Sequence, residues 1–299
     1  MNPHHKGALL ALSSAAGFAT LPIFIKFSYA AGANTLTILT TRFILAAACL
    51  WLILHLRNIS PVINKKLGFQ LCLLGIVGYG AMSAAFAASL QYLPASLSSM
   101  LLYMYPAIVS LLALVMGDDQ LNWQKFVALI ICFSGLFLIL GVSFAGVSLI
   151  GVLCGIVSAI VYSLYILVGN RLLKNVDSLV ATTYVCTAAA ATFALTSLIS
   201  GEFIFELPVT GWITLLAMAL LSTIVGIVCF FAAMTYIGPA NASIISIAEP
   251  VLTVFMSILL LGEKITPPQL GGGLLILIGI LILQLWGTEK QSQQAAGAS

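Results

Sequence analysis

One stretch decides the fold of this chain: Tyr236-Ile237-Gly238-Pro239-Ala240-Asn241-Ala242-Ser243, followed at residues 248–250 by Ala-Glu-Pro. Three of its residues, Tyr236, Ser243 and Pro250, each have an identical counterpart 144 positions earlier. The same interval relates further identical pairs, so that the full set is Gly7 and Gly151, Ser14 and Ser158, Ala15 and Ala159, Phe86 and Phe230, Ala88 and Ala232, Tyr92 and Tyr236, Ser99 and Ser243, Pro106 and Pro250, and Gly135 and Gly279. The chain therefore consists of two copies of one unit.

The amino-acid composition places both copies in a membrane. Of the 299 residues, 62% are hydrophobic and only 6% are charged, far below the roughly one-quarter of charged residues in soluble domains. The net charge of +3 is small and scattered, which argues against nucleic acid and leaves the lipid bilayer as a partner. The six cysteines stand singly in apolar stretches, so we expect them to be packing residues, and we expect no metal and no cofactor.

Apolar stretches near the bilayer-crossing length of about 20 residues recur along the chain. There are ten, at residues 7–29, 34–56, 67–90, 96–117, 123–141, 147–170, 178–200, 210–233, 240–262 and 268–286. A unit of five helices ends on the side opposite its start, so the second copy inserts upside down. The sequence predicts an all-α integral membrane fold of ten transmembrane helices as two inverted five-helix repeats, residues 1–144 and 145–288, with a disordered cytoplasmic tail at 289–299.

Lysine and arginine residues predict the orientation. With the N-terminus inside, the inner segments hold most of them, namely Lys6, Arg57, Lys65, Lys66, Lys125, Arg171, Lys174 and Lys290. We therefore expect a multi-pass protein of the cell (inner) membrane with both termini cytoplasmic. A cleaved signal peptide is the weaker interpretation of the first stretch, because Gly7, Ser14 and Ala15 recur in the sixth.

The second copy carries a distinctive set of residues: Tyr236, Gly238, Pro239, Ala248-Glu249-Pro250, Leu261-Gly262-Glu263, Gln269, Gly271 and Gly279. With this set, each half resembles the EamA domain of the drug/metabolite transporter superfamily. The first half departs from the pattern, with Tyr105-Pro106 in place of Glu-Pro and Gly117-Asp118-Asp119 in place of Leu-Gly-Glu. The resemblance covers nearly the whole chain, and it implies a ten-helix transporter that exports small metabolites or facilitates their passage.

Only two charged residues, Arg42 and Glu249, lie well inside the predicted helices. Inserting a charged side chain at the centre of a membrane helix costs about 2.5 to 3.5 kcal/mol, so each of these two residues is expected to have a structural or functional role. Neither is repeated, since the counterpart of Arg42 is Cys186 and the counterpart of Glu249 is Tyr105. We expect Glu249 either to contact the substrate or carry a proton, or to satisfy backbone groups freed by Pro250. We expect Arg42 to be a strut paired with Glu249 or with helix carbonyls, the alternative being that it binds a substrate carboxylate.

Pro106 and Pro250 lie at equivalent midpoints of the fourth and ninth stretches. A proline there breaks the helical hydrogen-bond ladder, so both helices should kink and leave carbonyls facing a cavity or a neighbouring helix. Substrates of inverted-repeat transporters bind at this depth. We therefore expect both prolines to line a central cavity, with plain helix bending as the alternative.

Aromatic and hydroxyl residues on the early helices of each copy, and on the fourth helix, complete the predicted lining. Beside the substrate-binding set below, the further candidates are Thr20, Ser83, Tyr103, Ser163 and Phe231. The predicted substrate-binding set is Phe18, Tyr79, Phe86, Tyr105, Pro106, Tyr162, Tyr165, Phe230, Glu249 and Pro250, with Arg42 and Glu249 as charged or coupling residues. Such a lining suits an apolar or amphipathic solute with a few polar groups, such as an amino acid or an organic cation.

Residues at the helix ends and runs of small residues have structural interpretations. Four charged residues lie at helix ends, where a charged side chain reaches water and costs little free energy. We expect them to cap helices and to anchor the helix ends at the membrane–water interface: Asp118, Asp119, Glu263 and Lys264. The glycines at 271–273 and Gly279 should let helices approach closely, or form the face of a homodimer. The sequence leaves a monomer and a homodimer both open.

The predicted function is a membrane transporter, an exporter or a facilitator, that moves small organic metabolites by alternating access. Protons are a further partner that the sequence leaves open. The alternative is a lipid scramblase or a sensor on a transporter fold. An intramembrane enzyme is disfavoured, because the sequence has no His-Glu-x-x-His motif, no Gly-x-Ser-x-Gly motif and no pair of intramembrane aspartates.

Overall fold

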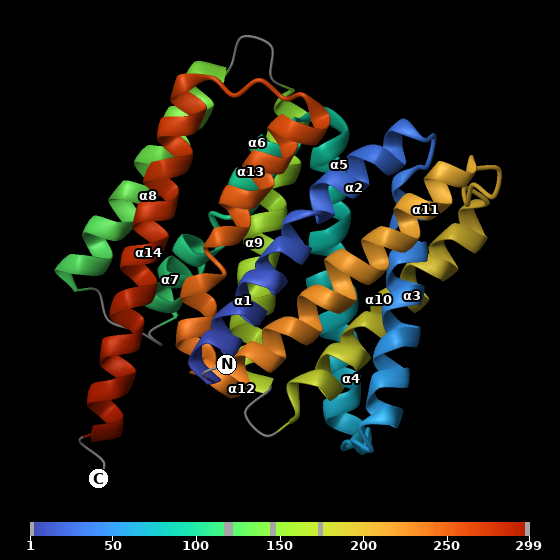
Figure 1. The fold of residues 1–299 in the computed structure, drawn as a ribbon, viewed down its shortest axis with the longest axis horizontal. Coiled ribbons are helices and arrows are strands. Elements are labelled where there is room, and N and C mark those ends of the chain that lie inside the picture. Colours follow the sequence, from blue (N-terminus) through green and yellow to red (C-terminus); the bar gives the residue numbers. More distant parts are fainter. Residues whose placement is uncertain (1–2, 117–121, 144–147, 173–175, 297–299) are drawn as a thin grey trace.

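The computed structural model describes residues 3–116, 122–143, 148–172 and 176–296, and in this part of the chain every regular element is a helix. Figure 1 shows helical spans that run up and down through one bundle, and the described residues form ten of them. Nine have the length and hydropathy of membrane-crossing helices, and the tenth contains the shorter apolar helix Trp123–Ile139. The predicted all-α fold of ten transmembrane helices is confirmed.

The spans of the first copy follow the predicted stretches closely. They are α1 and α2 (Pro3–Ala19 and Leu21–Ala30), α3 (Thr35–Leu56), the series α4, η1 and α5 (Lys65–Leu73, Leu74–Gly80 and Ala81–Tyr92), α6 and α7 (Ala95–Leu102 and Tyr105–Val115), and α8 (Trp123–Ser143). The segment η1 is π-helical.

The spans of the second copy repeat this order. They are α9 (Leu149–Leu172), α10 (Ser178–Ser200), the series α11, η3 and α12 (Val209–Ala217, Met218–Val225 and Gly226–Ile245), α13 (Ala248–Leu261) and α14 (Pro267–Ala296). Gly238 interrupts α12 with a φ of 78°, a left-handed value that glycine tolerates without strain. The eighth span ends there, and the ninth begins at Asn241 and continues into α13.

The irregular parts of the helices are duplicated as well. The π-helical segments η1 and η3 begin at Leu74 and Met218, which are counterparts. The fourth span breaks at Tyr103 and Met104, just before Pro106, and the ninth breaks at Ser246 and Ile247. The kinks predicted from the two prolines are therefore present, and each proline lies in the first turn of the second half-helix, where a missing N–H costs nothing.

Helices of one copy pack mainly against helices of the other. The main contacts between the copies are α1 with α12, α9 with α5, α3 with α10, and α8 with α14 (Figure 1). When each helix is replaced by its counterpart in the other copy, the contact of α1 with α12 becomes that of α9 with α5. The other two contacts, α3 with α10 and α8 with α14, join counterparts and so stay the same. This is the arrangement expected of inverted repeats. The two termini lie at the same end of the bundle (Figure 1).

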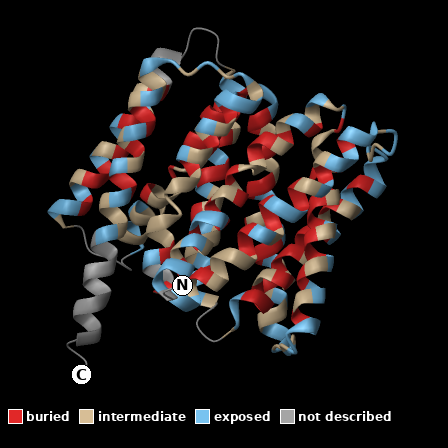
Figure 2. Cartoon of the chain, viewed as in Figure 1, coloured by how far each residue is buried: buried red, intermediate tan, exposed pale blue. Residues whose placement is uncertain are grey.

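Burial follows this arrangement. Figure 2 shows buried residues on the inward sides of the helices and exposed residues on the outward sides, most clearly on α8 and α14. Many exposed residues are large and apolar, such as Phe137, Leu198 and Ile199, which are 77%, 78% and 86% exposed. Apolar side chains on the outer surface of a helical bundle are the composition that contact with lipid requires.

The contact between α8 and α14 depends on glycine. A Cβ atom added to Gly272 would lie 2.6 Å from the carbonyl oxygen of Gly135 and 3.1 Å from the backbone nitrogen of Ile139. These are backbone atoms, which cannot move aside as a flexible side chain can. The neighbouring Gly271 differs, because a Cβ atom there would meet only Leu138, at 3.5 Å.

We expect Gly272→Ala to destabilise the protein by about 1 to 3 kcal/mol through overpacking between α8 and α14. Gly271→Ala is the matched control and should unfold like the wild type, since its methyl group has room. Thermal unfolding of both purified variants in detergent measures the difference. Equal unfolding temperatures for the two variants would contradict the close approach of the helices at Gly272.

Glu263 joins the loop after α13 to the start of α6. Gly262 ends α13 with a φ of 65°, and the carboxylate of Glu263 then accepts hydrogen bonds from the backbone nitrogens of Ala95 and Ser96 and from the Ser96 hydroxyl. The N-cap residue of α6 is Pro94, whose side chain makes no capping hydrogen bond. The expectation that Glu263 caps a helix is confirmed. Asp118 and Asp119 lie outside the described residues.

We expect Glu263→Ala to lower the free energy of unfolding by about 1.5 to 3 kcal/mol, the range for hydrogen bonds to a charged group. Glu206→Ala is the control, because Glu206 is exposed and makes no hydrogen bond. Chemical unfolding in mixed detergent micelles measures both variants. An unfolding midpoint of Glu263→Ala that matches the control would show that the cap contributes nothing.

The last helix extends beyond its apolar part. Helix α14 continues to Ala296, through most of the segment 289–299. Glutamine, alanine, glutamate and lysine make up most of this segment, and all of them have good helix propensity, so the last span can extend past its apolar part.

Candidate functional site

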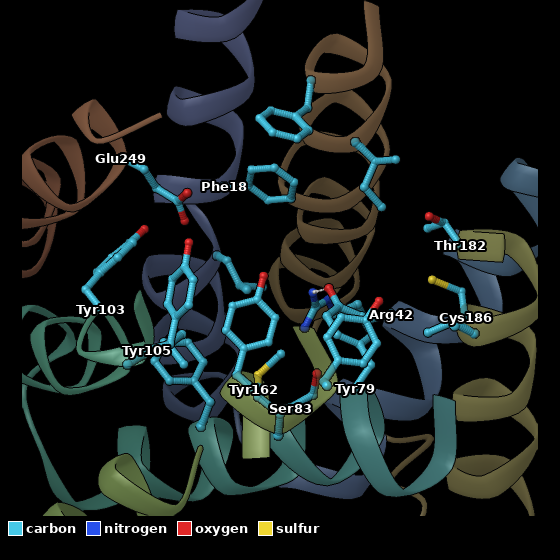
Figure 3. A pocket seen from close by; sticks show the side chains of 18 of the residues that line it. Phe18, Arg42, Tyr79, Ser83, Tyr103, Tyr105, Tyr162, Thr182, Cys186 and Glu249 are labelled. Carbon is cyan, nitrogen blue, oxygen red and sulfur yellow. Dashed lines mark hydrogen bonds between the residues drawn. The ribbon is translucent and has the colours of Figure 1, made fainter. Parts of the chain in front are cut away.

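A cavity of about 230 Å³ lies in the bundle between the two copies (Figure 3). Its walls come from both halves of the chain: from α1, α2, α3, η1, α5, α6 and α7 on one side, and from α9, α10, α12 and α13 on the other. Nine of the residues predicted for the substrate site line it, namely Phe18, Arg42, Tyr79, Phe86, Tyr105, Tyr162, Tyr165, Phe230 and Glu249. The structure thus brings together side chains that are far apart in the sequence.

The two predicted prolines lie just beyond this cavity. Pro106 and Pro250 line a second, smaller cavity of about 110 Å³, which shares Tyr103, Tyr105, Phe230 and Glu249 with the first. Next to Pro106, the Tyr105 carbonyl accepts a hydrogen bond of 3.1 Å from the hydroxyl of Ser163. The prolines therefore shape the boundary between two cavities.

The walls of the larger cavity consist largely of equivalent positions of the two copies. Six such pairs line it, each separated by 144 residues: Phe18 and Tyr162, Leu21 and Tyr165, Arg42 and Cys186, Ser83 and Ile227, Phe86 and Phe230, and Tyr105 and Glu249. Only the pair of phenylalanines is unchanged. The scaffold is duplicated, but the chemistry of its cavity is not.

Four tyrosine rings form a continuous row along the cavity. The ring centroids of Tyr79 and Tyr165 are 5.5 Å apart, those of Tyr165 and Tyr162 are 5.8 Å apart and nearly parallel, and those of Tyr162 and Tyr105 are 4.7 Å apart. These spacings are typical of interacting aromatic pairs. Figure 3 shows Glu249 beyond one end of this row, near Tyr103 and Tyr105, and Arg42 at the other end, beside Tyr79.

Arg42 is held by hydroxyl groups and not by a carboxylate. It is only 2% exposed, its Nε donates to the hydroxyl of Thr223 at 3.2 Å, and its Nη2 donates to the hydroxyl of Tyr79 at 3.3 Å. Tyr79 and Thr223 are counterparts in the two copies. The guanidinium also lies 5.1 Å from the centroid of the Phe43 ring. The expected pairing of Arg42 with Glu249 or with helix carbonyls is wrong, because hydroxyls supplied by both copies take that place.

Glu249 is oriented by the break in its helix. It is the second residue of α13, directly after the interruption at Ser246 and Ile247, so its side chain lines both cavities. The hydroxyls of Tyr103 and Tyr105 point toward its carboxyl group in Figure 3, and Tyr103 interacts with it.

Some lining residues stand outside the predicted substrate-binding set. Tyr103, Ser83 and Phe231 were further candidates from the sequence, and the structure places all three in the wall of the cavity. Cys186, expected to be a packing residue, lines the cavity, and the repeat offered a signal for it because Arg42 is its counterpart. Thr223 is the counterpart of Tyr79 and had the same kind of signal, but its hydrogen bond with Arg42 depends on the contact of α3 with η3, which the repeat does not reveal.

Known proteins resemble this chain over almost all of its length. The EamA-like transporter family model matches residues 5–141 and again residues 149–285. Uncharacterized transporter YcbK of Bacillus subtilis (strain 168) is 25% identical over 298 residues, which cover 95% of this chain and 96% of that protein. An uncharacterized transporter of Archaeoglobus fulgidus is 28% identical over 211 residues, or 70% of this chain and 75% of that protein.

A solved crystal structure superposes with a TM-score of 0.67 at 17% sequence identity, covering 95% of this chain and 98% of that chain, and so has the same fold. The family match takes in both copies, each of which contains five of the ten spans and one wall of the central cavity. This chain is a multi-pass membrane protein with two EamA domains, and it belongs to the EamA-like transporter family.

Proposed function

We propose that this protein moves a small amphipathic organic solute with a cationic group through the cavity between its two copies. Glu249 carries the proposal. It is a carboxylate at membrane depth, it lines a cavity whose other walls are mainly aromatic and apolar, and no basic side chain of the described residues is paired with it. A carboxylate in such a place is expensive unless a cation comes to it.

The aromatic lining supports a cationic solute. Tyr103, Tyr105 and Tyr162 present rings beside the Glu249 carboxyl (Figure 3). Aromatic faces attract ammonium groups electrostatically, and this attraction strengthens when the ligand is desolvated. Phe18 and Phe230 add apolar wall for the rest of the solute. The cavity of about 230 Å³ suits an organic cation or an amino acid of moderate size.

The inverted repeats support alternating access as the mechanism. The helices that form the cavity pack across the two copies and contain paired breaks and paired π-helical segments. In inverted-repeat transporters, the two copies can exchange their conformations, which opens a central site to one side and then to the other. The proposal includes export or facilitated passage, an inner-membrane location with both termini cytoplasmic, and action as a transporter and not as an enzyme.

Transport into liposomes tests the proposal. Purified full-length protein is reconstituted and offered trimethyl(2-phenylethyl)ammonium, a permanently charged aromatic cation that does not cross a bilayer unaided, together with a panel of amino acids. A fluorescent lipid in the same vesicles reports scrambling. We expect saturable flux of one or more of the solutes and no scrambling. Scrambling without flux of any solute would favour the lipid scramblase instead.

A further inference from the structure

Arg42 is a buried cation, and none of the described residues gives it an anionic partner. In this part of the chain its guanidinium donates hydrogen bonds from Nε and Nη2, both to neutral hydroxyls, and none from Nη1. It faces the cavity, where the only carboxylate is Glu249 at the other end of the row of tyrosines (Figure 3). Guanidinium groups recognise carboxylates with high geometric specificity, so this end of the cavity presents unused donors for an anion.

Ser83 provides a second and independent indication of a ligand. Its side chain lines the same cavity and is 2% exposed, yet its Oγ has no hydrogen-bond partner. A buried hydroxyl without a partner costs about 1 to 3 kcal/mol, so such groups are rare in native structures and want an explanation. A ligand atom that accepts a hydrogen bond would satisfy both Ser83 and the free N–H groups of Arg42.

We infer that Arg42 and Ser83 form an anion subsite and that the solute is an elongated zwitterion, with its carboxylate at this subsite and its ammonium group at Glu249. The inference rests on the proposed function and narrows its substrate class. The spacing of the charges follows from the row of rings, because Tyr79, Tyr165, Tyr162 and Tyr105 lie in succession between the two charged residues. A solute whose two charges are only a few bonds apart reaches one end or the other, and not both.

The asymmetry of the two copies agrees with this polarity. Arg42 and Ser83 are in the first copy, and their counterparts Cys186 and Ile227 line the cavity without charge. Glu249 is in the second copy, and its counterpart is Tyr105. Each copy therefore contributes one charged end of the site. A solute that bridges the copies through opposite charges is complementary to this arrangement.

Three small molecules test the inference by competition binding to the full-length protein in detergent, with radiolabelled phenethylammonium as the tracer. The first, 4-(2-aminoethyl)benzoate, carries a carboxylate and an ammonium group at opposite ends of a ring. Phenethylammonium is the same molecule without the carboxylate. L-Phenylalanine is an isomer of the first compound in which the two charges are close together.

We expect 4-(2-aminoethyl)benzoate to bind about tenfold more tightly than phenethylammonium, equal to about 1.4 kcal/mol, because a hydrogen-bonded charge pair forms at Arg42. L-Phenylalanine should gain less from its carboxylate. In Ser83→Ala, the ratio of the affinity for 4-(2-aminoethyl)benzoate to that for phenethylammonium should fall by several-fold. This variant removes no hydrogen bond within the protein, so it should fold normally.

Arg42→Lys is the second variant, and it keeps the charge but loses the planar array of donors. We expect it to reduce the preference for 4-(2-aminoethyl)benzoate over phenethylammonium. The subsite is overturned if wild type binds the two compounds equally well, or if Ser83→Ala and Arg42→Lys both keep the full preference. Binding of phenethylammonium without such a preference refutes the subsite and leaves the proposed function standing. No binding of any of the three compounds contradicts both.

Discussion

Glu249→Gln is expected to reduce the flux of trimethyl(2-phenylethyl)ammonium into liposomes by roughly 10- to 100-fold, the range for loss of one interaction with a charged group. Glutamine keeps the shape of the side chain and removes its charge, so the cation loses its partner and keeps the aromatic walls. Initial rates of uptake measure the effect. Glu206→Gln is the matched control, because that carboxylate is exposed and away from the cavity, and it should transport like the wild type.

The same pair of proteins tests whether Glu249 carries a proton. If it does, transport by the wild type depends on pH, and the remaining transport by Glu249→Gln does not, because the amide does not titrate. Rates that match the wild type at every pH would contradict both the cation-binding and the proton-carrying role of Glu249. A variant with reduced transport and an unchanged pH profile would contradict the proton role alone.

Cys186→Arg is expected to destabilise the protein by about 3 kcal/mol or more, the cost of a further unpaired charge at membrane depth. Cys186 is fully buried and lines the cavity close enough to Arg42 for the two to interact electrostatically. A second guanidinium there would repel the first, with no carboxylate between them. Cys186→Ser introduces no charge and is the control, with an expected change within about 1 kcal/mol.

The exchanged double variant, Arg42→Cys with Cys186→Arg, should recover most of that stability. Arg42 is held by Tyr79 and Thr223, which are counterparts, so the relocated guanidinium meets the same two hydroxyls with their roles exchanged. Thermal unfolding in detergent, followed by tryptophan fluorescence, compares the three proteins. A double variant that is as unstable as Cys186→Arg alone would show that the hydroxyl pair is not equivalent on the two sides.

The helices could be predicted from the sequence because their signals are local. A span is an apolar stretch of fixed length, and its break is marked by Pro106 or Pro250 within a few residues. The inverted arrangement followed from the odd number of spans in each copy. The lining of the cavity could be predicted in part, because Tyr105 and Glu249 lie directly beside these breaks, at the depth where such a site forms.

The contacts between the copies could not be predicted, because they depend on how distant helices face each other. Nothing near Arg42 in the sequence identifies Thr223, which is 181 residues away, as its partner. Glu263, which caps α6, lies 168 residues along the sequence from Ala95, whose backbone N–H donates a hydrogen bond to its carboxylate. The π-helical segments also lack a local signal. Such features are fixed by tertiary packing, which overrides local propensity.

Covalent labelling of the cavity is the most direct test that the solute site lies between the two copies. Purified protein is irradiated with 4-azidophenethylammonium, with and without excess trimethyl(2-phenylethyl)ammonium, and the labelled residues are identified by mass spectrometry. The proposal predicts adducts at Tyr105, Tyr162 or other cavity residues, and their disappearance when the competitor is present. Competed adducts found only on the outer surface, at residues such as Phe133 and Phe137 of α8, would contradict it.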